Sequence, residues 1–465
     1  MLKKIFYILT LGVFATGCSK MNEAEEVKQL LESQPVPVLF GTYVSQNADT
    51  RSTVVTDKEL QGTAGSINSL EKLQAVGFSV FGHYTDNTTY TANASGPNFM
   101  YNQKVEWNAT SGAWEYRPIK YWPNEGTDYL SFFAYAPRID NPAGTGTNNE
   151  INPEDKSATH WGIVNLTDNH TDEDPWVDYK PAQITKESVD LLWAVDNTTG
   201  KPHIDLSKPG VNEKVELRFK HALAGFKVTV KVDADLWDEL TDGDKTDLRN
   251  STLISIDKME IKGSFPNAAR LNLNNYTANV PAWDYTNSAK YDDETEKIST
   301  FVIDDQSIVE YLRTPENIWK NKDNFSEGLD ETFEAHLNGT HRMLGATGEE
   351  NLFMKDGTEE TMLMVIPPQN DTDLEVKLTY SVTAVNPRLE LTGGYHRITQ
   401  TVSKTLDNIS IEAGNIYVIN CAIGLNGVRL KIVNVYEWSE PIVFGAPDVD
   451  PWRPEDRGSL DFEVE

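Results

Sequence analysis

The sequence has little positive charge for its length. Its 465 residues include 41 Lys and Arg against 71 Asp and Glu, which gives a formal net charge of −30. Nucleic acid is not an expected partner, because its phosphates would be repelled and no basic stripe interrupts the acidic balance. The charge favours a well-solvated extracellular surface.

Cysteine is almost absent, with Cys18 and Cys421 as the two examples. Cys18 lies in an export segment, and a lipidated cysteine cannot pair, so we expect no disulfide. Cys421 lies in the apolar run YVINCAIGL, where we interpret it as a small buried residue.

Recognisable catalytic and metal-binding motifs are also missing. There is no GxSxG, phosphate-binding loop or HExxH, and His336 and His341 have no second ligand cluster nearby in the sequence. We interpret His221, in FKHAL, as a core or edge histidine. The acidic segment HTDEDPWVD at residues 170–178 could hold Ca²⁺, but it lacks EF-hand spacing, so a solvated loop is favoured. We therefore expect no enzyme, no metal and no cofactor.

The first apolar run is too short to span a membrane. Residues 1–18 read MLKKIFYILTLGVFATGC, with two lysines before an apolar stretch at 5–14. The segment ends in small residues before Cys18, which resembles a lipobox, although Ala15 stands where Leu is usual. We predict a lipoprotein signal peptide at 1–17, acylation of Cys18 and anchoring at the outer membrane. The alternative is an ordinary secretory signal with a chance cysteine.

Aromatic residues are abundant between residues 98 and 138. The runs FMYNQKVEW, WEYRPIKYWP and YLSFFAYAP predict antiparallel strands joined by tight turns. In the first run, alternation predicts one aromatic face and one mostly polar face, with Met100, Asn102, Lys104 and Glu106 on the polar side. An apolar face of this kind is usually covered by a second sheet.

A first strand is predicted at residues 35–45, with Val36, Val38, Phe40 and Val44 on one face. A polar turn containing Arg51 follows it. Residues 217–232 are expected to bend at Gly225. Two short helices are predicted at 308–319 and 329–337. The other predicted strands lie at 76–84, 189–195, 252–263, 361–366, 374–382, 396–406, 416–423 and 428–438.

Seven short segments follow one another along the chain. They are TRST at 50–53, W-x-Y-x-P-x-KYWP at 114–123, SFFAYAP at 131–137, VDLLWA at 189–194, LRFKHALAGFKVTV at 217–230, MLMVIPPQ at 362–369 and AGNIYVINCAIGLN at 413–426. In this order they resemble the fimbrillin family, the Mfa-like and FimA-like pilus subunits of Gram-negative anaerobes.

The resemblance implies an all-β fold of two tandem transthyretin-like antiparallel β-sandwiches after the signal peptide. The expected parts are 1–17 (signal), 18–51 (tether, first strand and processing site), 52–234, 235–438 (the two sandwiches) and 439–465 (tail). By resemblance, an Arg-specific protease would cut between Arg51 and Ser52. The first strand could then leave, and a strand of another pilus subunit could replace it in a homo- or heteropolymer that serves adhesion.

The carboxyl-terminal tail is the candidate donor strand. Leu460, Phe462 and Val464 alternate with acidic residues, which would present one apolar face to a groove. A frayed acidic terminus, or a tail that folds back on its own domain, is the alternative.

A surface glycan-binding lipoprotein is the second functional hypothesis, since the chain has 11 Trp. That function needs several exposed coplanar rings, whereas Trp107, Trp114 and Trp122 fall in strand-like runs that predict burial. A β-sandwich hydrolase is the weakest hypothesis, because no constellation of residues supports it.

Lipidation gives the first testable prediction. Cys18→Ala removes the acceptor sulfur, so the precursor should stay unprocessed and should not be labelled by a fatty-acid probe. Normal labelling of this variant in cells would contradict the assignment of Cys18.

Overall fold

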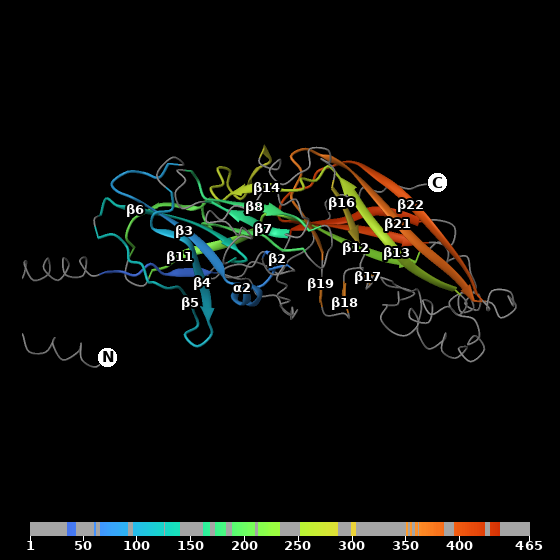
Figure 1. Ribbon diagram of the computed structural model, residues 1–465, viewed down its shortest axis with the longest axis horizontal. Coiled ribbons are helices and arrows are strands. Elements are labelled where there is room, and N and C mark those ends of the chain that lie inside the picture. Colours follow the sequence, from blue (N-terminus) through green and yellow to red (C-terminus); the bar gives the residue numbers. More distant parts are fainter. Residues whose placement is uncertain are drawn as a thin grey trace, which may run out of the picture.

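The computed structural model describes residues 35–42, 60–61, 66–91, 96–124, 126–139, 161–167, 173–182, 188–209, 213–232, 252–286, 299–303, 350–351, 354–355, 359–360, 362–385, 395–423 and 428–437. Within them the chain is almost entirely β-structure, which confirms the predicted all-β class. Figure 1 shows an elongated arrangement, with the blue strands in one half and the orange strands in the other.

An eight-stranded sheet forms the main layer of the first half. Phe, Tyr, Trp and β-branched residues dominate its strands, as is usual for a half-buried pleated surface. The order is β1 (Phe40–Thr42), β11 (Val215–His221), β9 (Leu192–Val195), β6 (Tyr129–Ala136), β3 (Phe78–Thr85), β4 (Met100–Asn108) and β5 (Ala113–Glu115), with β10 (His203–Leu206) also beside β6.

A second, five-stranded sheet packs on this layer. Its order is β15 (Ala282–Asp284), β14 (Ala269–Asn272), β8 (Trp176–Lys180), β7 (Trp161–Leu166) and β2 (Leu60–Gln61). Phe133 and Trp193 of the first sheet share a buried cluster with Val177 and Leu271 of the second. The two inner faces therefore exclude water together, as in a β-sandwich.

One short helix, α2 (Leu70–Val76), precedes β3. The Ser69 hydroxyl accepts a hydrogen bond from the Lys72 amide at 3.3 Å, and Gly77 ends the helix with φ +67°. Its Leu73 side chain is buried.

The second half contains two larger sheets and one small ribbon. One sheet has the order β17 (Glu350–Asn351), β12 (Ala224–Val232), β23 (Asn415–Ile423) and β24 (Val428–Glu437), with β20 (Leu363–Val365) also beside β12. The other has the order β16 (Ser299–Ile303), β13 (Thr252–Gly263), β21 (Thr372–Val385) and β22 (Tyr395–Ile409). Strands β18 (Met354–Lys355) and β19 (Glu359–Glu360) pair separately.

Most neighbouring strands are antiparallel, as predicted. Among the described strands, three pairs are parallel: β1 with β11, β2 with β7, and β12 with β23. Each joins segments far apart in the sequence, which short turns cannot do.

The chain changes sheets at Ala222 and Leu223. These two residues are fully buried between β11 and β12. The Ala222 amide donates to the Leu191 carbonyl, its carbonyl accepts from the Trp283 indole, and the Gly414 amide donates to the Leu223 carbonyl, at 2.8, 3.0 and 2.8 Å. The bend expected at Gly225 therefore lies two or three residues earlier. Hydrogen bonds to Leu191, Trp283 and Gly414 hold its backbone.

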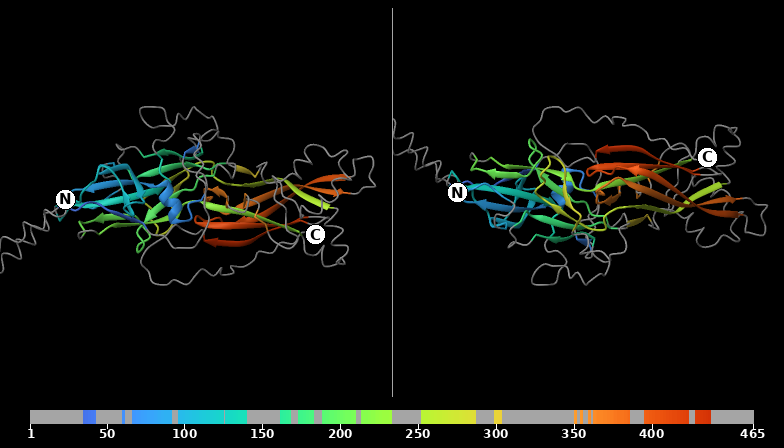
Figure 2. Two further views of the ribbon diagram at one scale, coloured as in Figure 1. Left: turned by 90° about the horizontal axis from the view of Figure 1, so that it is seen from below. Right: turned by 90° about the horizontal axis from the view of Figure 1, so that it is seen from above.

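The two halves share part of one core. Met364 and Val418 of the second half belong to the same buried cluster as Phe133 and Trp193 of the first. The chain also returns to the first half after β13, because β14 pairs with β8. Figures 1 and 2 show β14 away from the orange strands, which lie in the other half. The predicted boundary at 234 lies outside the described residues and stays a prediction, but strand pairing crosses that position in both directions.

A β-bulge reverses the predicted faces at the start of β4, whereas Lys104 and Glu106 are exposed and Val105 is buried as predicted. From Val80 to Gly82, β3 advances two residues, while β4 advances three from Gln103 to Met100. Asn102 takes φ +43° at this point. An extra residue reverses the side-chain alternation beyond it. Met100, predicted on the polar face, is consequently 2% exposed and in the core.

Two other local predictions need correction. The run at 114–123 is a strand only in its first residues, since β5 ends at Glu115 and a single bridge at Tyr121 follows. Pro118 and Pro123 cannot donate to a sheet, which explains the short strand. Strands β7 and β8 are not among the predicted strands.

The predicted helices at 308–319 and 329–337 lie outside the described residues, and so does the side chain of Cys421. No helix in the described ranges is long and apolar enough to cross a membrane.

His221 is a core histidine, as predicted, and its partner is Asp190. Both side chains are fully buried, with Nδ1 of His221 2.9 Å from the Asp190 carboxylate. The Asp190 Oδ2 atom also accepts a hydrogen bond from the Ile67 amide at 2.8 Å. The Asp190 carboxylate thus connects His221 of β11 to Ile67, which lies shortly before α2.

Asp190→Ala should lower the unfolding free energy by about 3 kcal/mol, because it leaves two buried polar groups without their partner. The exposed Asp86→Ala is the control, with an expected change within about 0.5 kcal/mol. Denaturant unfolding measures both. Equal midpoints for the two variants would contradict this role of Asp190.

Candidate functional site: the groove of the first strand

The first strand is held along both of its edges. On one side, the Val38 amide donates to the Lys120 carbonyl and the Trp122 amide donates to the Val36 carbonyl, both at 2.9 Å. On the other side, the Val215 amide donates to the Leu39 carbonyl at 2.8 Å. Strand β1 then continues in parallel with β11. The segment therefore fills a gap between β11 and the chain that follows β5.

Three side chains of this segment point into the core. Val36, Val38 and Phe40 are 4%, 0% and 3% exposed, which confirms the predicted apolar face for these three. Val44, the fourth predicted member, lies outside the described residues. Burial of such side chains contributes roughly 1.5–3 kcal/mol each relative to exposure.

Phe40 lies in a cage of three aromatic rings, which we call the Phe40 pocket. Its ring centroid is 5.6 Å from those of Tyr116 and Phe132 and 6.3 Å from that of Phe78. The rings meet edge to face or tilted, and in this arrangement the positive edge of one ring is attracted to the negative face of another. These partners come from β3, β6 and the residue after β5, so the pocket is built from distant parts of the sequence.

Tyr116 also ties its pocket to the strand through a polar contact. Its hydroxyl donates to the Val38 carbonyl at 2.8 Å. Burial raises the pKa of Tyr116 to about 12, so the phenol keeps its proton at neutral pH and remains a donor.

Gly41 lies under a carboxylate. A Cβ atom at this position would overlap the side-chain carboxylate of Glu216, the residue opposite it on β11. The groove therefore accepts glycine at this point, and a larger residue only if Glu216 moves.

The chain beyond the first strand is anchored separately. Leu60 and Gln61 pair with β7, and the Ile67 amide is held by Asp190. Arg51 and Ser52, the predicted cleavage residues, lie between Thr42 and Leu60, outside the described residues. A cut between them would leave the first strand attached to the body through noncovalent contacts.

The other predicted site residues also lie outside the described residues. These are the lipidation residue Cys18 and the donor-strand residues Leu460, Phe462 and Val464.

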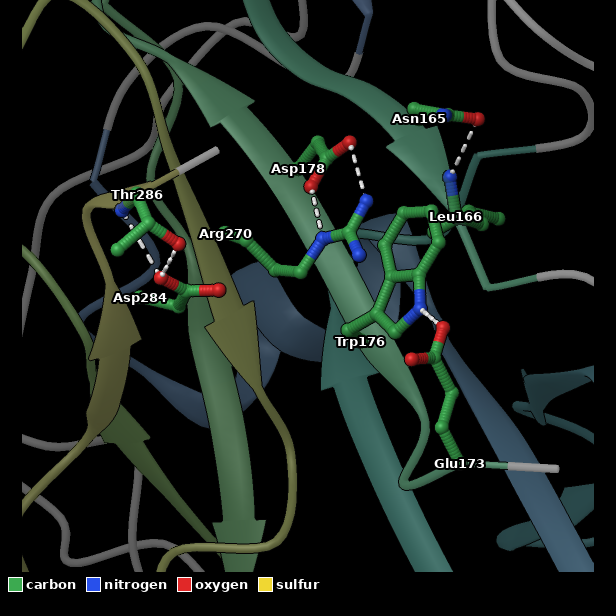
Figure 3. A network of polar contacts seen from close by, with 8 residues as sticks. All are labelled: Asn165, Leu166, Glu173, Trp176, Asp178, Arg270, Asp284 and Thr286. Carbon is green, nitrogen blue, oxygen red and sulfur yellow. Dashed lines mark hydrogen bonds and ion pairs between the residues drawn. The ribbon is translucent and has the colours of Figure 1, made fainter. Parts of the chain in front are cut away.

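The acidic segment at 170–178 is not a solvated loop at its two described aspartates. Asp178 is fully buried, and its oxygens accept from Nε and Nη2 of Arg270 at 2.8 and 3.3 Å. Figure 3 shows the Arg270 guanidinium between this carboxylate and the Trp176 ring, whose centroid lies 3.3 Å from Cζ. The charge is thus neutralised within the β8–β14 pair.

Asp174 is the second buried carboxylate, at 4% exposure. It accepts hydrogen bonds from the hydroxyls of Tyr90 and Tyr276 and from the amides of Asn272 and Asn274. Burial and this carboxylate raise the pKa of Tyr276 to about 12. No group of three potential metal ligands occurs among the described residues.

The described tryptophans do not form an exposed platform. Trp114 and Trp122 are 8% and 3% exposed, and Trp107 is half-buried against the same cluster. The rings of Trp107 and Trp114 meet at 70° instead of lying coplanar. The geometry of the described residues therefore gives the glycan-binding hypothesis no support.

These features define a class: a β-protein of several packed sheets in which an amino-terminal strand fills the groove between β11 and the segment after β5. Residues 66–438 match the sequence profile of the fimbrillin-like family. The chain belongs to the fimbrillin-like family.

Two solved structures can be compared with this chain, and the first of them agrees at the level of the fold. A fimbrial protein from Bacteroides vulgatus has a TM-score of 0.52 and 16% identity, over 87% of this chain and 100% of that one. A candidate cell adhesion protein from Bacteroides uniformis has a TM-score of 0.39 and 14% identity, over 87% and 99%. No curated relative matches significantly.

The Phe40 pocket makes a stability prediction. Phe40→Ala should lower the unfolding free energy of the unprocessed protein by about 3 kcal/mol or more, because it leaves a cavity among three rings. The half-buried neighbour Leu39 provides the matched control, and Leu39→Ala should cost about 1 kcal/mol. Denaturant unfolding should separate them. A larger loss for Leu39→Ala would contradict the assignment of Phe40 as the anchor.

Proposed function

We propose that this protein is a structural subunit of a cell-surface pilus that serves adhesion. Membership of the fimbrillin-like family supports this role. The observation that carries the proposal is the first strand, which has three buried side chains and backbone hydrogen bonds along both edges. Removal of such a strand would leave a long apolar groove with two unpaired edges, and unpaired edges recruit strands.

The precursor is exported as a lipoprotein and anchored in the outer membrane through Cys18. The short apolar stretch before that cysteine supports this step. The lipid would hold each subunit at the cell surface until processing, so the membrane is a partner of the precursor.

An Arg-specific protease then cuts between Arg51 and Ser52. Support comes from the two anchors on either side of this bond, the groove before it and the β2–β7 pairing after it. Cleavage there frees residues 1–51 without breaking any described element of the body. The released strand can then leave the groove.

The carboxyl-terminal tail of another subunit refills the groove by strand addition. Strand addition satisfies the backbone groups of both edges and fills the pockets with alternate side chains. The partners are other pilus subunits, in a homo- or heteropolymer. The role is structural and requires neither catalysis nor a cofactor.

Amino-terminal sequencing of surface filaments tests the processing step. Wild-type filaments should start at Ser52. Arg51→Ala should abolish the cut and reduce filament number, because the resident strand stays covalently attached. Lys58→Ala, a basic residue in the same stretch, should be processed normally. Filaments of normal number that start at Cys18 would overturn the proposal that cleavage precedes assembly.

A further inference from the structure

The tail contains a near copy of the strand that occupies the groove. Residues 37–41 read Pro-Val-Leu-Phe-Gly, and residues 441–445 read Pro-Ile-Val-Phe-Gly. Pro, Phe and Gly are identical at the same spacing. The two remaining positions exchange aliphatic residues that differ by one methylene.

Two of the identical residues face specific features of the groove. Phe40 fills the three-ring pocket, and the aligned residue is Phe444. Gly41 lies where a side chain would overlap Glu216, and the aligned residue is Gly445. Both constraints act on neighbouring residues, so a Phe-Gly pair satisfies them together.

The aliphatic positions agree as well. Val38 is fully buried, and Ile442 adds one methylene there. Leu39 is only half-buried, and the aligned Val443 is one methylene shorter. Pro37 forms the isolated bridge to Tyr121 without offering an amide hydrogen, and Pro441 matches it.

The likeness ends before the proline. Val36 is 4% exposed, whereas Glu440 is the aligned residue in the tail. The tail copy therefore covers the register from Pro37 to Gly41 and ends before the position of Val36, where a carboxylate would replace a buried side chain.

The tail of the same molecule is too short to take this register. The Gly414 amide bonds the Leu223 carbonyl, and Asn415 pairs with Glu437, so the end of β24 lies close to Leu223. Pro37 lies at the far end of the groove, three residues upstream of the residue opposite Val215. Eleven residues of strand separate these points, about 36 Å at roughly 3.3 Å each. The four residues from Glu437 to Pro441 span at most about 14 Å.

We infer that residues 441–445 are the segment that takes the place of the first strand, and that they do so in the groove of a second molecule. This inference rests on the proposed function, in which the first strand leaves its groove. It assigns the register: Phe444 enters the Phe40 pocket and Gly445 lies under Glu216. Leu460, Phe462 and Val464 are then not the residues that fill this pocket.

Filament assembly by full-length variants tests the assignment. Phe444→Ala empties the pocket and should reduce filament number at least tenfold with normal processing at Arg51. Val443→Ala, which corresponds to the half-buried Leu39, is the matched control and should assemble within about twofold of wild type. Deletion of residues 458–465 should also leave assembly intact.

The outcomes separate this inference from the proposed function. If Phe444→Ala assembles normally while removal of residues 439–465 abolishes filaments, the register is wrong and tail exchange stands. If the chain without residues 439–465 also forms normal filaments, tail exchange itself is wrong. Loss of assembly on deletion of 458–465, with normal assembly of Phe444→Ala, would favour Leu460, Phe462 and Val464 instead.

A disulfide cross-link tests the register directly. Gly41 is opposite Glu216, so Gly445→Cys combined with Glu216→Cys should give covalent multimers of processed subunits under oxidising conditions. Ala446→Cys with Glu216→Cys is the control, because the next residue of a strand faces the other side. Cross-linked multimers for the first pair and their absence for the second support the register. The reverse pattern, or an intramolecular bond in the first pair, overturns it.

Discussion

The insertion of the first strand between β11 and the segment after β5 is the constraint on which the first half depends. Strand β1 pairs with β11 at one end of the eight-stranded sheet, β5 forms the other end, and the chain after β5 returns to the first strand. Phe78, Trp114 and Phe132 face the space between them. Without Val36, Val38 and Phe40 these rings would meet water. The first strand therefore both covers the apolar core and pairs with the backbone on either side. Its residues precede all other described elements in the sequence.

The two halves of the molecule are joined by packing as well as by connection. Ala222 and Leu223 carry the chain from one sheet to another, and hydrogen bonds from Leu191, Trp283 and Gly414 fix their backbone. Met364 and Val418 extend the core of the first half into the second. Buried polar contacts such as His221 with Asp190 then specify how neighbouring segments meet. An apolar core shared in this way resists separation of the halves.

The same distribution of aromatic residues explains why the fold suits a structural role. Most of the described tryptophans and phenylalanines are buried or half-buried, as Phe132, Phe133 and Trp193 show. The carboxylates that could form a cation site, Asp174 and Asp178, are held by tyrosines, asparagines and an arginine. These aromatic side chains and carboxylates stabilise the packing of the strands, in agreement with membership of the fimbrillin-like family.

The sequence by itself determined the all-β class, the family, and the buried face of the first strand, because aromatic and β-branched alternation is a local property that each segment carries alone. It also contained the repeat of Pro-x-x-Phe-Gly, whose meaning needed the Phe40 pocket and the position of Glu216. Only the tertiary structure decided the parallel pairing of β1 with β11, the bulge that turns Met100 inward, the change of sheet at Leu223 and the burial of Asp178. Each of these depends on a partner far away in the sequence, and local pattern carries no information on which distant strand will satisfy a given backbone edge or charge.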